Sequence, residues 1–159
     1  MQEFEPVQPE KFDPEKIVSV IEKLIDRCRD GEQIYADAAE HIQDPPLKQR
    51  FLDSSRERAR FAAELEGELE RQGRWQTTRQ GSVTGMVERT AYDVKRALGG
   101  NDLAILQSLE HYEDHARDAY EQALREPLPD EVAGLLRTQA QTVYSAHDHM
   151  KMLRDRKAA

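Results

Sequence analysis

Apolar residues recur at steps of three and four along most of the chain, which is the spacing of one face of an α-helix. This pattern predicts a shorter helix at 82–98 and four long ones, at about 14–43, 45–72, 102–126 and 129–156. Residues 1–12 carry no such period. We therefore expect an N-terminal tail at 1–12, followed by a single helical domain at 13–157.

The ends of the predicted helices carry residues that suit those positions. Asp13 and Asp44 each precede a proline and can accept a hydrogen bond from the first amides of a helix, which have no backbone partner. Asn101 offers the same cap to the third long helix. Gly73 follows the second long helix and suits the left-handed conformation that often closes a helix. Short proline-containing turns therefore join the first two and the last two long helices into antiparallel hairpins.

The connection between the two hairpins is much longer and holds the shorter helix, which at about 16 residues spans roughly 24 Å. A four-helix bundle with one long crossover is the arrangement of ferritin-like folds. The predicted fold class is therefore all-α, a ferritin-like four-helix bundle with a long crossover connection that contains a short extra helix.

Composition and charge narrow the classes of function. The hydrophobic fraction is 38% and the charged fraction 34%, a mixture that suits long amphipathic helices better than a β-sheet. A net charge of −8 argues against nucleic-acid binding, because that affinity comes mainly from cations neutralising phosphates. No run of about 18 apolar residues is present, so we expect no membrane span.

The single cysteine, Cys28, excludes an internal disulfide and a cysteine-based zinc cluster, and we expect it to be a small core residue. The acidic, proline-containing N-terminus is unlike a secretory signal peptide. The expected location is therefore the cytoplasm.

Five charged or titratable residues interrupt the apolar stripes near the middle of the predicted bundle: Glu32, Arg58, Glu110, Glu113 and His147. Counting outward from the turns places the first two about level with each other, and likewise Glu110 and His147. We therefore expect a central polar layer, with the hydroxyls of Tyr35 and Tyr120 reaching it. An alternative role for either tyrosine is redox chemistry beside a metal.

A ferritin-like di-metal site needs one glutamate from each of two helices and a Glu-x-x-His pair from each of the other two. No glutamate of this chain has a histidine three residues on, and the second helix offers Arg58-x-x-Phe61 instead. An arginine keeps its proton in proteins, and its fork fits carboxylates. The favoured interpretation is that Arg58 stands where a metal would stand, paired with Glu32 or Glu113. It predicts no catalytic residue and no cofactor.

The alternative is a bound iron or manganese ion, and its tentative ligands are Glu32, Glu110, Glu113 and His147. Two other histidines, His111 and His115, are four residues apart and can share a helix face. They flank the inward carboxylates, so we expect them to face water.

Several stretches together resemble one protein family: "DGEQIYADAAE" (30–40), "RARFAAEL" (58–65), "HYEDHARDAY" (111–120) and "AHDHMKMLR" (146–154). The chain is similar over residues 17–155 to an uncharacterised bacterial family of ferritin-like four-helix-bundle proteins. The resemblance implies a cytoplasmic bundle, sometimes associated with stress conditions, with no assigned reaction. It also implies that the family-like interior residues are Asp30, Glu32, Arg58, Glu113 and His147.

Three functions follow as hypotheses. The first is a non-enzymatic ferritin-like protein with an Arg–carboxylate layer in place of a di-metal site. The second is an iron- or manganese-binding protein with oxidase or peroxide-related activity. The third is a helical assembly module that pairs, for example as a homo-oligomer, through an exposed apolar stripe on the crossover helix near Trp75.

Overall fold

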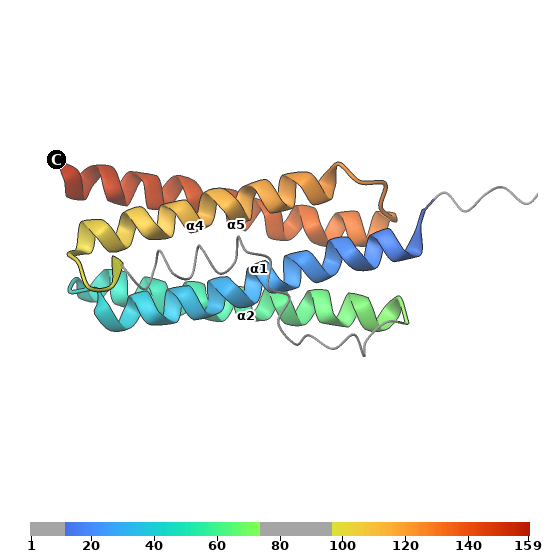
Figure 1. The fold of residues 1–159 in the computed structure, drawn as a ribbon, viewed down its shortest axis with the longest axis horizontal. Helices are drawn as coiled ribbons and strands as arrows, with labels where there is room; N and C mark the ends of the chain where they lie inside the picture. Colours follow the sequence, from blue (N-terminus) through green and yellow to red (C-terminus); the bar gives the residue numbers. More distant parts are fainter. Residues whose placement is uncertain (1–11, 74–96) are drawn as a thin grey trace, which may run out of the picture.

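Four α-helices packed as a bundle make up the computed structural model, which describes residues 12–73 and 97–159 (Figure 1). The helices are α1 (Pro14–His41), α2 (Pro45–Arg71), α4 (Asp102–Leu124) and α5 (Asp130–Ala158). Their bounds lie within two residues of those predicted for the four long helices. The predicted crossover helix at 82–98 and Trp75 lie outside the described residues, as does the predicted tail apart from Phe12.

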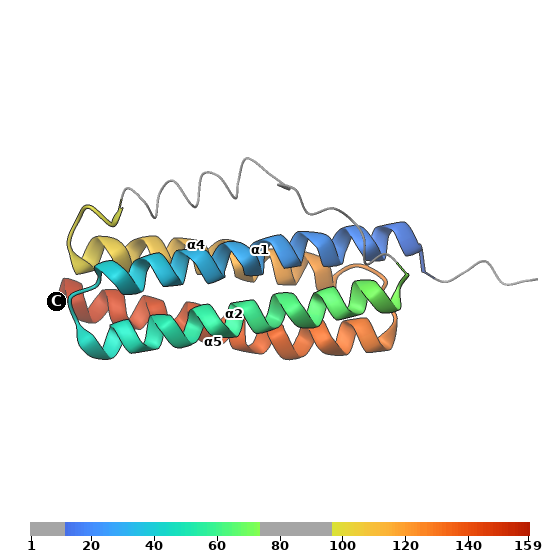
Figure 2. The ribbon, with the colours of Figure 1, turned by 90° about the horizontal axis from the view of Figure 1, so that it is seen from below.

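The four helices run side by side along the length of the bundle (Figures 1 and 2). The hairpin of α1 and α2 packs against the hairpin of α4 and α5, mainly through α1 and α4. Helix α2 ends at the end of the bundle where α5 begins, whereas α4 begins at the opposite end (Figure 2). Helices α2 and α4 therefore run in the same direction.

The helix ends follow the local rules expected from the sequence. The carboxylate of Asp13, the carboxylate of Asp44 and the amide oxygen of Asn101 accept hydrogen bonds from first-turn amides at 3.0, 3.2 and 3.0 Å. Gly73 follows α2 with a φ of +75°, a left-handed conformation that favours glycine. These caps depend only on near neighbours in the chain, which is why they can be read from sequence.

The core runs along the bundle axis and contains apolar residues from all four helices. Cys28 is fully buried within it. Seven polar or charged residues are also buried among the described residues: Arg27, Arg58, Glu68, Asp102, Glu113, Gln139 and His147. Arg58 heads the fully buried side chains in size. A charged group of that size inside an apolar core needs a partner, and this requirement locates the site.

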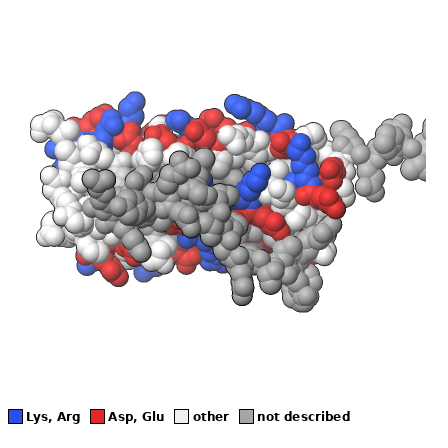
Figure 3. Space-filling view, in the orientation of Figure 1, with Lys and Arg blue, Asp and Glu red and all other residues white. Residues whose placement is uncertain are grey.

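The outer surface mixes the two signs of charge. On the face shown in Figure 3, acidic and basic side chains lie intermixed along the upper and lower edges of the described part of the bundle. Within the described ranges, none of the helices has the length and apolar character needed to cross a membrane.

Candidate functional site

A buried ion pair links α2 to α4 at the centre of the bundle. Arg58 Nη2 lies 2.7 Å from Glu113 Oε1, and the two side chains are 1% and 0% exposed. The hydroxyl of Tyr35, from α1, donates a hydrogen bond to the same carboxylate oxygen. One oxygen atom thus joins three helices.

The pair is held by charge more than by a full set of hydrogen bonds. Arg58 Nε and Glu113 Oε2 have no hydrogen-bond partner among the described residues, so the contact is not the bidentate fork that arginine often makes. Burial raises the pKa of Glu113, and the positive charge of Arg58 opposes that rise. Burial by itself lowers the pKa of Arg58, but Glu113 together with smaller contributions from Tyr112, Tyr35 and Cys28 outweighs it, and the pKa is raised. The charge of each partner therefore opposes the loss of charge that burial favours in the other.

Tyr35 is the neutral member of this cluster. Burial raises its pKa, and the negative charge of Glu113 raises it further, so the phenol keeps its proton and acts as a donor. Its ring packs edge-on against Tyr112, with centroids 6.1 Å apart. The polar contact is thus walled by aromatic rings, which exclude water from it.

Tyr112 is a central residue that the sequence interpretation missed. Its side chain is fully buried, and its hydroxyl donates to the carbonyl oxygen of Arg27 at 2.8 Å. The hydroxyl also lies against Gly31, where an added Cβ would be 2.1 Å away. The sequence signal that could have indicated this contact was Gly31. Glycine inside a helix costs about 1 kcal/mol relative to alanine, so its presence suggests that another group closely approaches the helix backbone there.

Gln139 is a second missed residue and forms a separate polar cluster with Tyr120. The Tyr120 hydroxyl donates to Gln139 Oε1 at 2.8 Å and lies 3.3 Å from the sulfur of Cys28. Gln139 Nε2 donates to the backbone carbonyl of Phe61 at 3.3 Å. Tyr120 therefore joins α4, α5 and α2 through this cluster and does not hydrogen-bond the Arg58–Glu113 pair.

The stretch that carries the ion pair also carries a family match. Residues 16–126 match the family described as a domain of unknown function, DUF2383, which is more than two thirds of the chain. The chain belongs to the DUF2383 family. The matched region contains Tyr35, Arg58 and Glu113 but ends before α5. No curated protein matches the chain.

The prediction that Glu32 belongs to the central layer of this DUF2383 bundle is corrected. Its carboxylate pairs with Arg29 at 2.9 Å on the outside of α1, and its side chain is 38% exposed. Positions 31 and 32 both fit the three- and four-residue steps between Cys28 and Tyr35. Gly31 takes the inner position because the Tyr112 ring needs the space.

The other expected members of the layer lie at the edge of the core. Glu110 pairs with Arg154 of α5 at 2.9 Å. His147 is buried, and its Nε2 lies 2.5 Å from Asp114 Oδ1. Both contacts link α4 to α5, and His147 is close enough to Glu113 that its positive charge would lower the pKa of that carboxyl.

The tentative metal ligands of the DUF2383 chain are thus not brought together. Each has a different ion-pair partner: Glu32 with Arg29, Glu110 with Arg154, Glu113 with Arg58, and His147 with Asp114. In the part of the chain that the structure describes, no group of three or more histidine, cysteine, aspartate or glutamate side chains is placed to hold a metal ion.

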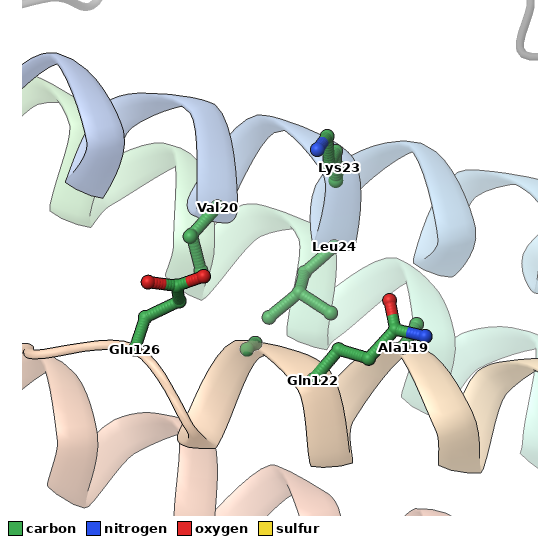
Figure 4. Close-up of a pocket in the computed structure, with 7 residues that line it drawn as sticks. Val20, Lys23, Leu24, Ala119, Gln122 and Glu126 are labelled. Carbon is green, nitrogen blue, oxygen red and sulfur yellow. The ribbon is translucent and has the colours of Figure 1, made fainter.

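A surface pocket between α1 and α4 was not anticipated from the sequence. Figure 4 shows its lining: Val20, Lys23, Leu24, Ala119, Gln122, Ala123 and Glu126. None of the predicted site residues is among them. Its polar groups are a lysine, an amide and a single carboxylate, which do not form a catalytic or metal-binding set.

Asp30 is an expected interior residue whose pKa makes the stability of the fold depend on pH. Its side chain is 7% exposed, and its Oδ2 lies 3.8 Å from Arg27 Nη1. Burial raises its pKa to about 6, and the positive charge of Arg27 opposes the rise. A carboxyl group with a raised pKa in the folded state contributes stability at low pH that is lost as pH rises through that value.

We therefore expect the free energy of unfolding of the wild type to fall between pH 4 and pH 8, relative to that of Asp30→Asn. The expected fall is about 1–2 kcal/mol, which includes a reduction for partial solvent access. Urea unfolding at both pH values measures the change. Asp53→Asn, at a carboxylate that is 62% exposed, is the matched control. The same pH response in both variants would contradict the assignment.

Proposed function

We propose that this DUF2383 chain is a non-catalytic, ferritin-like bundle protein in which the Arg58–Glu113 pair replaces a di-metal site and holds the helices in register. The observation that carries the proposal is the 2.7 Å contact between two side chains that are 1% and 0% exposed. The resemblance stated from sequence adds an unassigned, stress-related role in the cytoplasm.

The topology supports the ferritin-like part of the proposal. Two antiparallel hairpins pack together with α2 and α4 running in the same direction, as in bundles that have one long crossover (Figures 1 and 2). In such bundles the metal ligands point inward from the middle of the helices. Arg58 and Glu113 occupy that central region here.

The charge of Arg58 supports the non-catalytic part. Two unit charges about 4 Å apart interact by about 4 kcal/mol in a partly solvated protein environment, and a divalent ion doubles this. A metal ion bound to Glu113 would therefore be repelled by the guanidinium 2.7 Å from that carboxylate. The arginine already supplies the positive charge that the carboxylate requires.

A buried ion pair can contribute to the specificity of helix packing. A buried ion pair adds little net stability, because removing both charges from water offsets their attraction. A shift of α2 against α4 by one turn would leave two buried charges apart. The pair therefore acts against wrong registers more than it stabilises the correct one.

Elemental analysis tests the proposal. Protein purified without chelators from cells supplied with iron and manganese is expected to contain far less than one ion of either metal per chain. One iron or manganese ion per chain would overturn the proposal if it is lost in Glu113→Gln and kept in Glu32→Gln. The second variant is a matched control because Glu32 is partly exposed and paired elsewhere.

A further inference from the structure

His111 and His115 place two imidazole nitrogens side by side on the outer part of α4. Their Nε2 atoms are 3.1 Å apart, and their rings are nearly perpendicular, with centroids 4.6 Å apart. Both residues belong to one helix and are four positions apart, so the backbone sets this spacing. His111 is exposed and His115 is half-buried.

The spacing matches what two imidazole ligands of one metal ion require. Zinc–imidazole bonds are about 2.0–2.1 Å long, and an N–N separation of 3.1 Å then gives an N–metal–N angle of about 95–102°. This lies between the right angle of neighbouring ligands on a square-planar or octahedral ion and the tetrahedral angle. The distance between the two nitrogens therefore fits either case.

We propose that His111 and His115 chelate one divalent transition-metal ion through their Nε2 atoms, with water filling the other positions. Imidazole nitrogen suits copper, nickel and zinc, and affinity for a given set of nitrogen ligands is highest for Cu²⁺. This site differs in place and in ligand chemistry from the iron or manganese site considered at Glu113.

Charged neighbours act on this pair from both sides. Arg27, from α1, repels a cation, whereas Asp114 and Asp118, from α4, attract one. Burial, His111 and Arg27 all lower the pKa of His115, which favours the unprotonated imidazole that a metal ion requires. The 3.1 Å contact is a hydrogen bond in which one Nε2 is the donor, so this proton must leave or move to Nδ1 when the metal binds. With two protein ligands and a nearby guanidinium, we expect micromolar affinity, weaker than that of four-ligand structural zinc sites.

Titration of the full-length protein with copper(II) sulfate, followed by calorimetry and electron paramagnetic resonance, tests the proposal. We expect one Cu²⁺ per chain, with a spectrum that shows two nitrogen ligands. His111→Ala and His115→Ala are each expected to weaken binding at least tenfold. His41→Ala removes another exposed histidine, from the last turn of α1, and is expected to leave affinity unchanged.

Two results would overturn the inference: absence of binding to the wild type, or unchanged affinity in His111→Ala. Because His111 is exposed, its replacement is expected to leave the melting temperature unchanged, so a lost ligand is separable from misfolding. The iron and manganese analysis stands apart from this test. Copper binding lost in Glu113→Gln and kept in His111→Ala would count against the proposed function as well.

Discussion

Replacing Arg58 by methionine is expected to lower the free energy of unfolding by about 3–5 kcal/mol, the usual cost of removing one partner from a buried ion pair. The variant would leave the fully buried carboxylate of Glu113 with the hydroxyl of Tyr35 as its remaining donor. Domains of this kind have total stabilities of about 5–15 kcal/mol, so the variant lies near the limit of folding. Urea unfolding followed by circular dichroism measures the loss.

Two further variants separate the buried charge from other effects. Arg56→Met removes an arginine that is 74% exposed on the same helix, and its expected effect is within about 0.5 kcal/mol. Arg58→Met combined with Glu113→Gln removes both charges at similar volume and is expected to recover most of the loss. Equal effects at positions 56 and 58, or no recovery in the double variant, would contradict the role of the pair.

The pH dependence of the stability of Arg58→Met gives a second, independent test. Burial already raises the pKa of Glu113, and loss of the guanidinium that opposes the rise moves it higher. A group with a raised pKa in the folded state stabilises at low pH and loses that contribution as pH rises. The deficit of the variant relative to the wild type is therefore expected to shrink on acidification and to grow toward alkaline pH.

Replacing Gly31 by alanine is expected to destabilise the protein by about 3 kcal/mol, at the upper end for overpacked cores. The new Cβ would lie 2.1 Å from the hydroxyl oxygen of Tyr112 and 2.7 Å from the ring carbon that carries it, so the ring must move. At an open helical position the same change stabilises by up to about 1 kcal/mol. Thermal or urea unfolding shows whether Gly31→Ala destabilises the protein, as expected here, or stabilises it, as at an open position.

Gly134→Ala is the matched control, because nothing lies within 4 Å of a Cβ built on this α5 glycine. It is expected to stabilise the protein. Gly31→Ala combined with Tyr112→Phe is expected to recover part of the loss, since the nearest atom is gone but the ring carbon at 2.7 Å remains. A stabilising effect of Gly31→Ala would show that the two side chains do not pack as described.

The sequence by itself determined the helices, their ends and the inward position of Arg58. Helix periodicity and capping depend on residues a few positions apart, so Asp13, Asp44, Asn101 and Gly73 could be assigned without knowledge of distant contacts. A cation in an apolar stripe also indicates a buried partner. The sequence left that partner open between Glu32 and Glu113.

Only the tertiary structure decided which carboxylate Arg58 meets, because the choice depends on packing between helices. Two adjacent positions of α1 fit the apolar stripe, and the ring of Tyr112 selects the glycine and turns Glu32 outward. The partner of Tyr120 was decided in the same way, since Gln139 lies on another helix and has no local signal. Contacts between helices depend on the rotation of each about its axis, and a periodic pattern determines that rotation only to within about one residue.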